Sequence, residues 1–80
     1  MTIQIAEFTL SRLRDIGWSG QRARLLGSLA ELPTRQRSKL GKAVELVARQ
    51  VIRNSNSGSI QFALVDGEPQ LIEITIRQQG

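Results

Sequence analysis

The chain has 80 residues, of which 40% are hydrophobic and 22% charged, which is typical of one small globular domain and not of a disordered segment. It contains no cysteine and no histidine, which excludes disulfides, thiol chemistry, Cys/His zinc sites and every catalytic scheme that needs an imidazole. A domain this small buries only about 60% of the surface of its unfolded chain, so we expect support from a partner, a second copy or further chain.

The positive charge of the chain is concentrated before Ser55. Ten basic and four acidic residues lie there, which gives this part a net charge of +6, whereas 55–80 carries −2 and the whole chain +4. Such a basic segment can bind an anion or a nucleic acid, or can be an ordinary solvated surface. No apolar stretch approaches the about 20 residues of a membrane span, and Glu7 and Arg12 interrupt any signal-peptide pattern. We therefore expect a cytoplasmic protein without a membrane partner.

The N-terminal segment, 1–18, is predicted to be mainly helical. Residues 2–5 alternate like a short strand, and we leave 1–5 unassigned. Apolar residues at three- and four-residue steps then predict a helix over about 6–16. The residues that share this spacing are Ala6, Leu10, Leu13 and Ile16. Gly17 suits the C-terminal end of this helix, where the chain often needs a positive φ.

Two further helices are predicted in 19–54. Ser19 can cap a helix over about 20–32, which Pro33 ends because proline lacks the backbone donor. Thr34 can cap a longer helix over about 35–53, whose apolar residues form a continuous stripe at helical spacing. The residues of this stripe are Leu40, Ala43, Val44, Val47, Ala48 and Val51.

The C-terminal part, 55–80, is predicted to be a β-hairpin. Segments 59–66 and 70–77 each alternate between apolar and polar residues, and a turn-forming sequence separates them. The long helix must cover the apolar face, which consists of Ile60, Phe62, Leu64, Ile72, Ile74 and Ile76. The predicted fold is thus a single two-layer α+β domain, with helices packed on one face of a small antiparallel hairpin.

Three apolar residues are candidates for an interface with a partner. Trp18 can anchor an interface or can be a partly buried aromatic at a helix junction. Phe8 and Leu10 can belong to a docking or dimerisation element, or can complete the core. The carboxylates show no paired acid–base arrangement, so no catalytic or metal-binding residue is predicted.

Four segments follow one another in an order that characterises one family. Residues 31–40 contain a leucine–proline break with polar residues, and 43–54 read AVELVARQVIRN. Residues 57–64 form a glycine turn and a strand, and 69–80 form a second strand. In this respect 19–80 resembles the first half of a histidine-kinase-like (GHKL) ATPase domain, in the branch of anti-sigma-factor kinases and sensor histidine kinases. The family's N box, roughly A-V-S-E-x-A-R-N-A-x-R-Y-G, corresponds to 43–54.

The resemblance implies a nucleotide site, from which this chain departs at the reactive positions. Leu46 stands where the family has its general base, and leucine cannot accept a proton. Gln50 stands where the family has its magnesium-binding asparagine and is one methylene longer, which disturbs octahedral geometry. Arg53 matches the basic position, and the nucleotide-binding residues that the resemblance implies are Gln50, Arg53 and Asn54. Gln78 replaces the aspartate that reads adenine, so we expect no cofactor in the isolated chain, and Mg-ATP only if further sequence completes the pocket.

The leading prediction is a non-catalytic signalling or interaction module of a bacterial regulatory protein, which acts by dimerisation or by docking to a protein partner. The isolated chain is then not an enzyme. One alternative is the N-terminal fragment of an ATP-binding sensor kinase whose catalytic part lies beyond residue 80. Another is a small basic nucleic-acid-binding protein. Against the latter, the chain has only three aromatic residues and no recognisable base-reading helix, so we do not expect a nucleic-acid partner.

Overall fold

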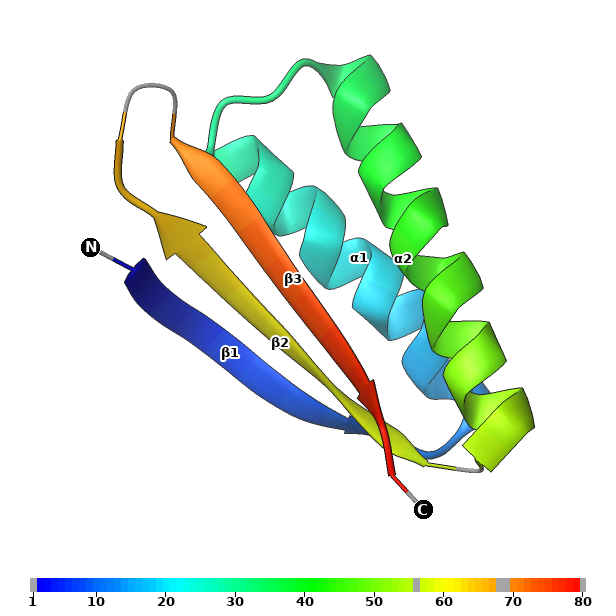
Figure 1. Cartoon of the computed structure of the whole chain (residues 1–80). Helices are drawn as coiled ribbons and strands as arrows, with labels where there is room; N and C mark the ends of the chain where they lie inside the picture. The colour runs from blue at the N-terminus through cyan, green and yellow to red at the C-terminus, as the bar shows by residue number, and fades with distance from the viewer. Residues whose placement is uncertain (1, 56, 68–69, 80) are drawn as a thin grey trace.

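Two helices lie side by side on one face of a three-stranded sheet (Figure 1). The computed structural model describes residues 2–55, 57–67 and 70–79. The elements in chain order are β1 (Thr2–Leu10), α1 (Leu13–Leu29), α2 (Thr34–Ser55), β2 (Gly58–Val65) and β3 (Leu71–Gln78). The predicted two-layer α+β architecture is confirmed, and the sheet has one strand more than the predicted hairpin.

The central strand of the sheet is β2, which pairs antiparallel with β1 on one side and with β3 on the other. The predicted hairpin is confirmed, with Val65 opposite Leu71 next to the turn and Gly58 opposite Gln78 at its far end. The alternation along β2 buries Ile60 and Phe62 under the helices. The partly buried residues of the hairpin that pack against this core are Leu64, Ile72, Ile74 and Ile76.

The helix predicted over 6–16 is wrong for 6–10, because Thr2–Leu10 is a strand, whereas 13–16 do belong to a helix, the first turn of α1. Ala6, Phe8 and Leu10 are oriented toward the core while Glu7 and Thr9 are exposed, which is a period of two. A step of four residues stays on one face of a strand as well as of a helix, so the spacing of Ala6 and Leu10 fits both. The register with β2 shifts between Gln4 and Ala6, and this bulge interrupts the alternation that would have revealed the strand.

The helix α1 continues without interruption through Gly17 and Ser19, where a break between two helices was predicted. It begins at Leu13, just after the backbone N–H groups of Ser11 and Arg12, which donate to Oδ2 of Asp15 at 3.0 and 2.9 Å. Ser19 does not cap a helix. Its side chain is buried in the middle of α1, and its Oγ donates to the carbonyl oxygen of Asp15 at 2.6 Å. The helix therefore starts seven residues before the predicted Gly20.

The C-terminal end of α1 is a Schellman turn that precedes Pro33. Glu31 adopts a left-handed conformation with φ of 61°. Its N–H donates to the carbonyl of Ser28 at 3.1 Å, and the N–H of Leu32 donates to the carbonyl of Gly27 at 2.9 Å. These two bonds end the helix at Leu29, earlier than the predicted residue 32.

The long helix α2 extends two residues beyond its predicted C-terminal end, from Thr34 to Ser55. Its buried face joins α1 and the sheet in one apolar core. The buried residues of this core are Leu10, Ile16, Ala23, Leu26, Val44, Ala48, Val51, Ile60 and Phe62. The core thus draws on all elements except β3, whose apolar residues stay partly exposed.

The two helices approach closely where each contributes a glycine. A Cβ on Gly20 of α1 would lie 2.6 Å from Cγ of Glu45, and a Cβ on Gly41 of α2 would lie 2.6 Å from Nε of Arg24. Nη2 of Arg24 in turn donates to Oε2 of Glu45 at 3.1 Å. Each glycine therefore leaves room for the ionic side chain of the opposite helix.

Candidate interaction surface

An exposed row of residues runs along the outer side of α1. Trp18, Arg22, Leu25 and Leu29 follow one another at steps of four, three and four residues, so they lie on one face of the helix. Leu25 is 57% exposed and Leu29 67%, which is high for two leucines close together on one face. An exposed apolar group of this kind is typical of a site that contacts another molecule.

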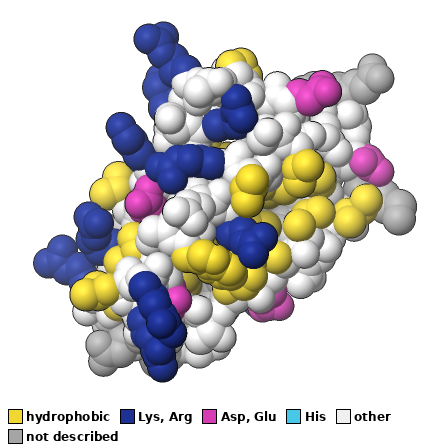
Figure 2. Space-filling model, turned by 180° about the vertical axis from the view of Figure 1, so that it is seen from behind, with side chains coloured by type: hydrophobic (Ala, Val, Ile, Leu, Met, Phe, Trp, Pro, Cys, Tyr) yellow, Lys and Arg dark blue, Asp and Glu magenta, His cyan; other side chains and the backbone are white. Residues whose placement is uncertain are grey.

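The N-terminal strand extends this apolar row across a groove. Ile3 and Ile5 are 45% and 46% exposed, and the bulge in β1 lets Ile5 line the groove next to Ala6. The groove has a volume of about 230 Å³, and its lining residues are Ile5, Ala6, Arg22, Leu25, Leu26, Ser28, Leu29 and Phe62. Figure 2 shows hydrophobic side chains gathered on this side of the molecule, with Lys and Arg side chains beside them.

An aromatic cluster connects this surface to the core. The rings of Phe8 and Trp18 meet edge to face, with centroids 4.0 Å apart, and Phe8 meets the buried ring of Phe62 at 5.8 Å. The guanidinium of Arg22 lies 4.9 Å from the centroid of the Trp18 ring. These contacts hold the side chains of Trp18 and Arg22 in place on the surface of α1.

The exposed apolar residues and Arg22 form one continuous surface, the β1–α1 surface. Its members are Ile3, Ile5, Trp18, Arg22, Leu25 and Leu29. Within the described residues, β1 pairs with β2 alone, so its other edge presents backbone N–H and C=O groups without a strand partner. The surface therefore offers both apolar side chains and a sheet edge.

The three residues predicted to lie at an interface differ in their exposure in the structure. Trp18 belongs to the β1–α1 surface and is 38% exposed. Phe8 is half-buried beneath Trp18 and supports it. Leu10 is fully buried in the core, so its assignment to an interface is wrong: as the last residue of β1, it faces the helices.

The residues that the ATPase resemblance implies lie at the other end of the helical layer. Gln50, Arg53 and Asn54 are exposed in the last turns of α2, and none of them lines the β1–α1 groove. Leu46, at the position of the family's base, is also exposed. Their role in binding a nucleotide stays a prediction.

Two kinds of site are absent from the described ranges 2–55, 57–67 and 70–79. No group of three His, Cys, Asp or Glu side chains there is arranged to hold a metal ion. Neither helix in this part of the chain is long and apolar enough to cross a membrane.

The fold and this surface define a small α+β domain with an exposed apolar surface built on one helix and one sheet edge. Comparison of the chain with protein families, with curated proteins and with solved structures gives no match. Sequence reasoning missed Arg22, Leu25 and Leu29 as surface residues because the predicted break at Gly17 separated Trp18 from the helix that follows. The spacing of Trp18 to Leu25 and Leu29 was the signal that could have found them.

Proposed function

We propose that this chain is a non-catalytic interaction module that associates with a second copy of itself through the β1–α1 surface. The observation that carries the proposal is the row of Trp18, Leu25 and Leu29 beside Ile3 and Ile5, which leaves adjacent large apolar side chains in water. Burial of apolar surface stabilises association by about 25 cal/mol per Å² before the costs of binding. A small domain gains stability from such burial.

A two-fold arrangement suits this surface. In an isologous contact the same patch meets itself, so α1 would pack against its counterpart and the open edges of β1 would lie near each other. Arg22 is the one charged member of the surface, and its guanidinium is already stacked on Trp18. The contact would thus set few like charges against each other, while the net charge of +4 on each copy repels at long range. Added salt should therefore strengthen the association.

Sedimentation equilibrium tests the proposal. We expect the chain to form dimers at micromolar concentration and the double variant Leu25→Gln/Leu29→Gln to be a folded monomer, because glutamine keeps the helix and removes the apolar contact. The matched control is Leu46→Gln, which changes a similarly exposed leucine on α2 and should leave the dimer intact. A wild-type chain that stays monomeric up to about 1 mM would refute self-association, because a Kd of about 1 mM corresponds to a binding free energy of only about 4 kcal/mol.

The signalling role rests on the resemblance to the first half of a histidine-kinase-like ATPase domain. What supports it is the succession of a long helix, a turn and two antiparallel strands at the expected places along the chain. The module would have kept this scaffold and lost nucleotide chemistry, since Leu46 and Gln50 occupy the reactive positions. Titration calorimetry with Mg-ATP tests this: we expect no heat of binding, and micromolar affinity would contradict a non-catalytic module.

A second candidate function is the N-terminal part of an ATP-binding sensor kinase. It is favoured by a second apolar groove, between α2 and β3, with a volume of about 310 Å³. Its lining residues are Leu40, Ala43, Val44, Val47, Ile74 and Ile76. Further chain could cover this groove and pair with β3. The gene provides the test: a glycine-rich continuation after the codon for Gly80 supports this function, and a stop codon there contradicts it.

A further inference from the structure

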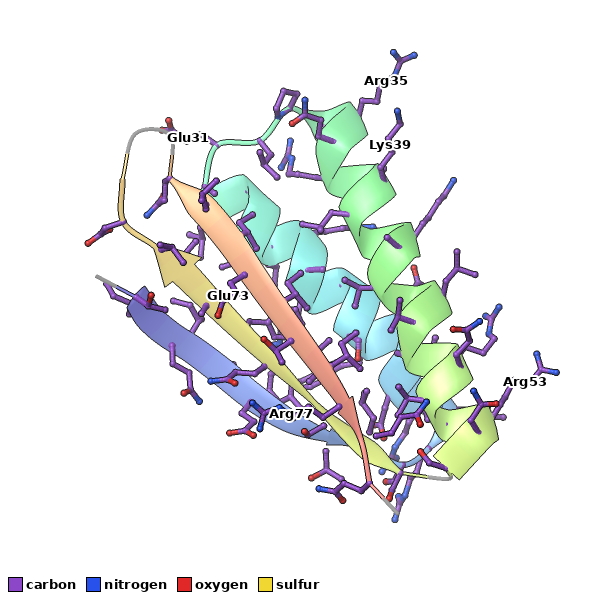
Figure 3. All side chains as sticks on the ribbon, viewed as in Figure 1. Glu31, Arg35, Lys39, Arg53, Glu73 and Arg77 are labelled. Carbon is purple, nitrogen blue, oxygen red and sulfur yellow. The ribbon has the colours of Figure 1, made fainter. Side chains whose placement is uncertain are left out.

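The solvent-facing side of α2 carries a row of five positive charges with one leucine among them. Six residues at steps of three or four form this α2 stripe, and at about 100° per residue they fall within about 80° of the helix circumference. They are Arg35, Lys39, Lys42, Leu46, Arg49 and Arg53, and all six are exposed. The stripe extends over about 27 Å at 1.5 Å per residue. Figure 3 shows that Arg35, Lys39 and Arg53 project from α2 away from the sheet.

The cations of the stripe differ from the other arginines of the helical layer. Arg24 is paired with Glu45, and Arg37 donates to Oγ1 of Thr34 at 2.8 Å. Within the described ranges, Arg24–Glu45 is the only ion pair, so none of the five stripe cations is neutralised there. Glu45 lies beside the stripe and is occupied by Arg24. This arrangement leaves five positive charges in one line without a partner.

The middle of the stripe is apolar. Leu46 is 61% exposed and lies between Lys42 and Arg49, one turn from each. An apolar centre with a charged rim is the usual composition of a protein contact. A row of phosphates offers no apolar group to contact an exposed leucine, whereas an acidic amphipathic helix can pack an apolar side chain against it.

We propose that the α2 stripe binds an acidic amphipathic helix of a partner protein, which lies along α2 with carboxylates opposite the five cations and an apolar residue on Leu46. The argument is charge complementarity: a helix of similar length presents side chains at the same three- and four-residue steps, so its carboxylates can meet the cations turn by turn. This surface is separate from the β1–α1 surface, so the proposed dimer can form while the stripe is occupied.

A synthetic helix provides the probe for this proposal. It is a fluorescein-labelled, alanine-rich peptide of about 21 residues, with glutamates at the positions that mirror the five cations and a leucine opposite Leu46. Fluorescence anisotropy at low ionic strength should detect binding that weakens as salt is raised, because exposed ion pairs are screened. A peptide of the same composition, with its glutamates distributed around the helix, should bind at least five-fold more weakly.

Two variants of equal net charge distinguish the contribution of the stripe to binding from that of the net charge. Lys39→Gln/Lys42→Gln/Arg49→Gln removes three stripe cations and should weaken binding by about ten-fold, since each exposed ion pair contributes about two-fold. The control Arg12→Gln/Arg14→Gln/Arg77→Gln removes the same charge from exposed positions elsewhere and should change binding less than two-fold. Circular dichroism checks that both triple variants remain folded.

Two results would overturn the proposal. One is equal binding of the two peptides, or equal loss in the two triple variants, because net charge alone would then explain the affinity. The other is tighter binding of a 20-base-pair duplex DNA than of the striped peptide at the same salt concentration, which would make the stripe a contact for phosphates. Neither result depends on the self-association state, which sedimentation measures independently.

Discussion

Nη2 of Arg24 on α1 donates to Oε2 of Glu45 on α2 at 3.1 Å, and each of these side chains lies over a glycine of the opposite helix. Glu45 crosses Gly20, and Arg24 crosses Gly41. The pair thus bridges the two helices, with both side chains partly exposed. It also assigns Glu45 a structural role, next to the position where the ATPase resemblance expects a catalytic base.

This ion pair should contribute modestly to stability. In a double-mutant cycle with Arg24→Met and Glu45→Gln, we expect a coupling of about 0.5–1 kcal/mol, because both side chains are partly exposed and water screens the pair. Urea unfolding of the four proteins measures it. A cycle of Arg53→Met with Glu45→Gln serves as the control and should be additive. Coupling of zero in the first cycle would show that the contact contributes nothing.

The stability of α1 should depend on the ionisation of Asp15. Hydrogen bonds from the backbone N–H groups of Ser11 and Arg12 lower the pKa of this carboxyl below its ordinary value of 3.8. A lowered pKa in the folded state contributes stability that is fully present above the ordinary pKa and is lost as the pH falls through the folded-state pKa. Asp15→Asn removes a negative charge from the first turn of α1, so it should cost about 0.3–1 kcal/mol at pH 7 and progressively less below about pH 4.

Thermal unfolding of wild type and Asp15→Asn between pH 2 and pH 7 measures this difference. Asp66→Asn is the control, since Asp66 is an exposed residue beyond the end of β2, and this variant should follow wild type. If the gap between wild type and Asp15→Asn is the same at pH 2.5 and pH 7, the carboxylate does not stabilise the start of α1.

Replacement of the left-handed residue after α1 by glycine should stabilise the protein. Glu31 has φ of 61°, a conformation that costs an ordinary side chain about 1–2 kcal/mol and glycine almost nothing. Part of the gain is offset by the greater freedom of glycine in the unfolded chain. We expect Glu31→Gly to stabilise the protein by about 1 kcal/mol in urea unfolding. Glu31→Ala removes the same charge but keeps Cβ, so an equal gain in both variants would contradict the backbone explanation.

The hairpin could be predicted from the sequence because its signal is local. Both strands alternate over seven or eight residues, and Asp66-Gly67 marks the turn between them. The strand β1 could not be predicted in this way, since both helices separate it from its partner β2 in the sequence. The bulge at Ile5 also breaks its alternation. The packing of Phe8 and Leu10 against the core depends on this distant pairing.

The interaction surface was predicted only in part. Trp18 was identified by its residue type, but Gly17 and Ser19 beside it were taken as a helix boundary. The structure has no such boundary inside α1, since Ser19 is buried in the helix and its hydroxyl donates to the carbonyl oxygen of Asp15. Only this continuous helix aligns Trp18 with Leu25 and Leu29.

The pairing of β1 with β2 joins two strands that both helices separate along the chain. Leu10 faces Gly58 and Thr2 faces Val65, so the first strand leaves the ribosome long before its neighbour has been synthesised. Until then its isoleucines and its backbone are exposed to other nascent chains. Contacts so far apart in sequence also slow folding, because the long intervening loop must close before they form. The strand β1 is therefore exposed to misassembly until β2 has been synthesised.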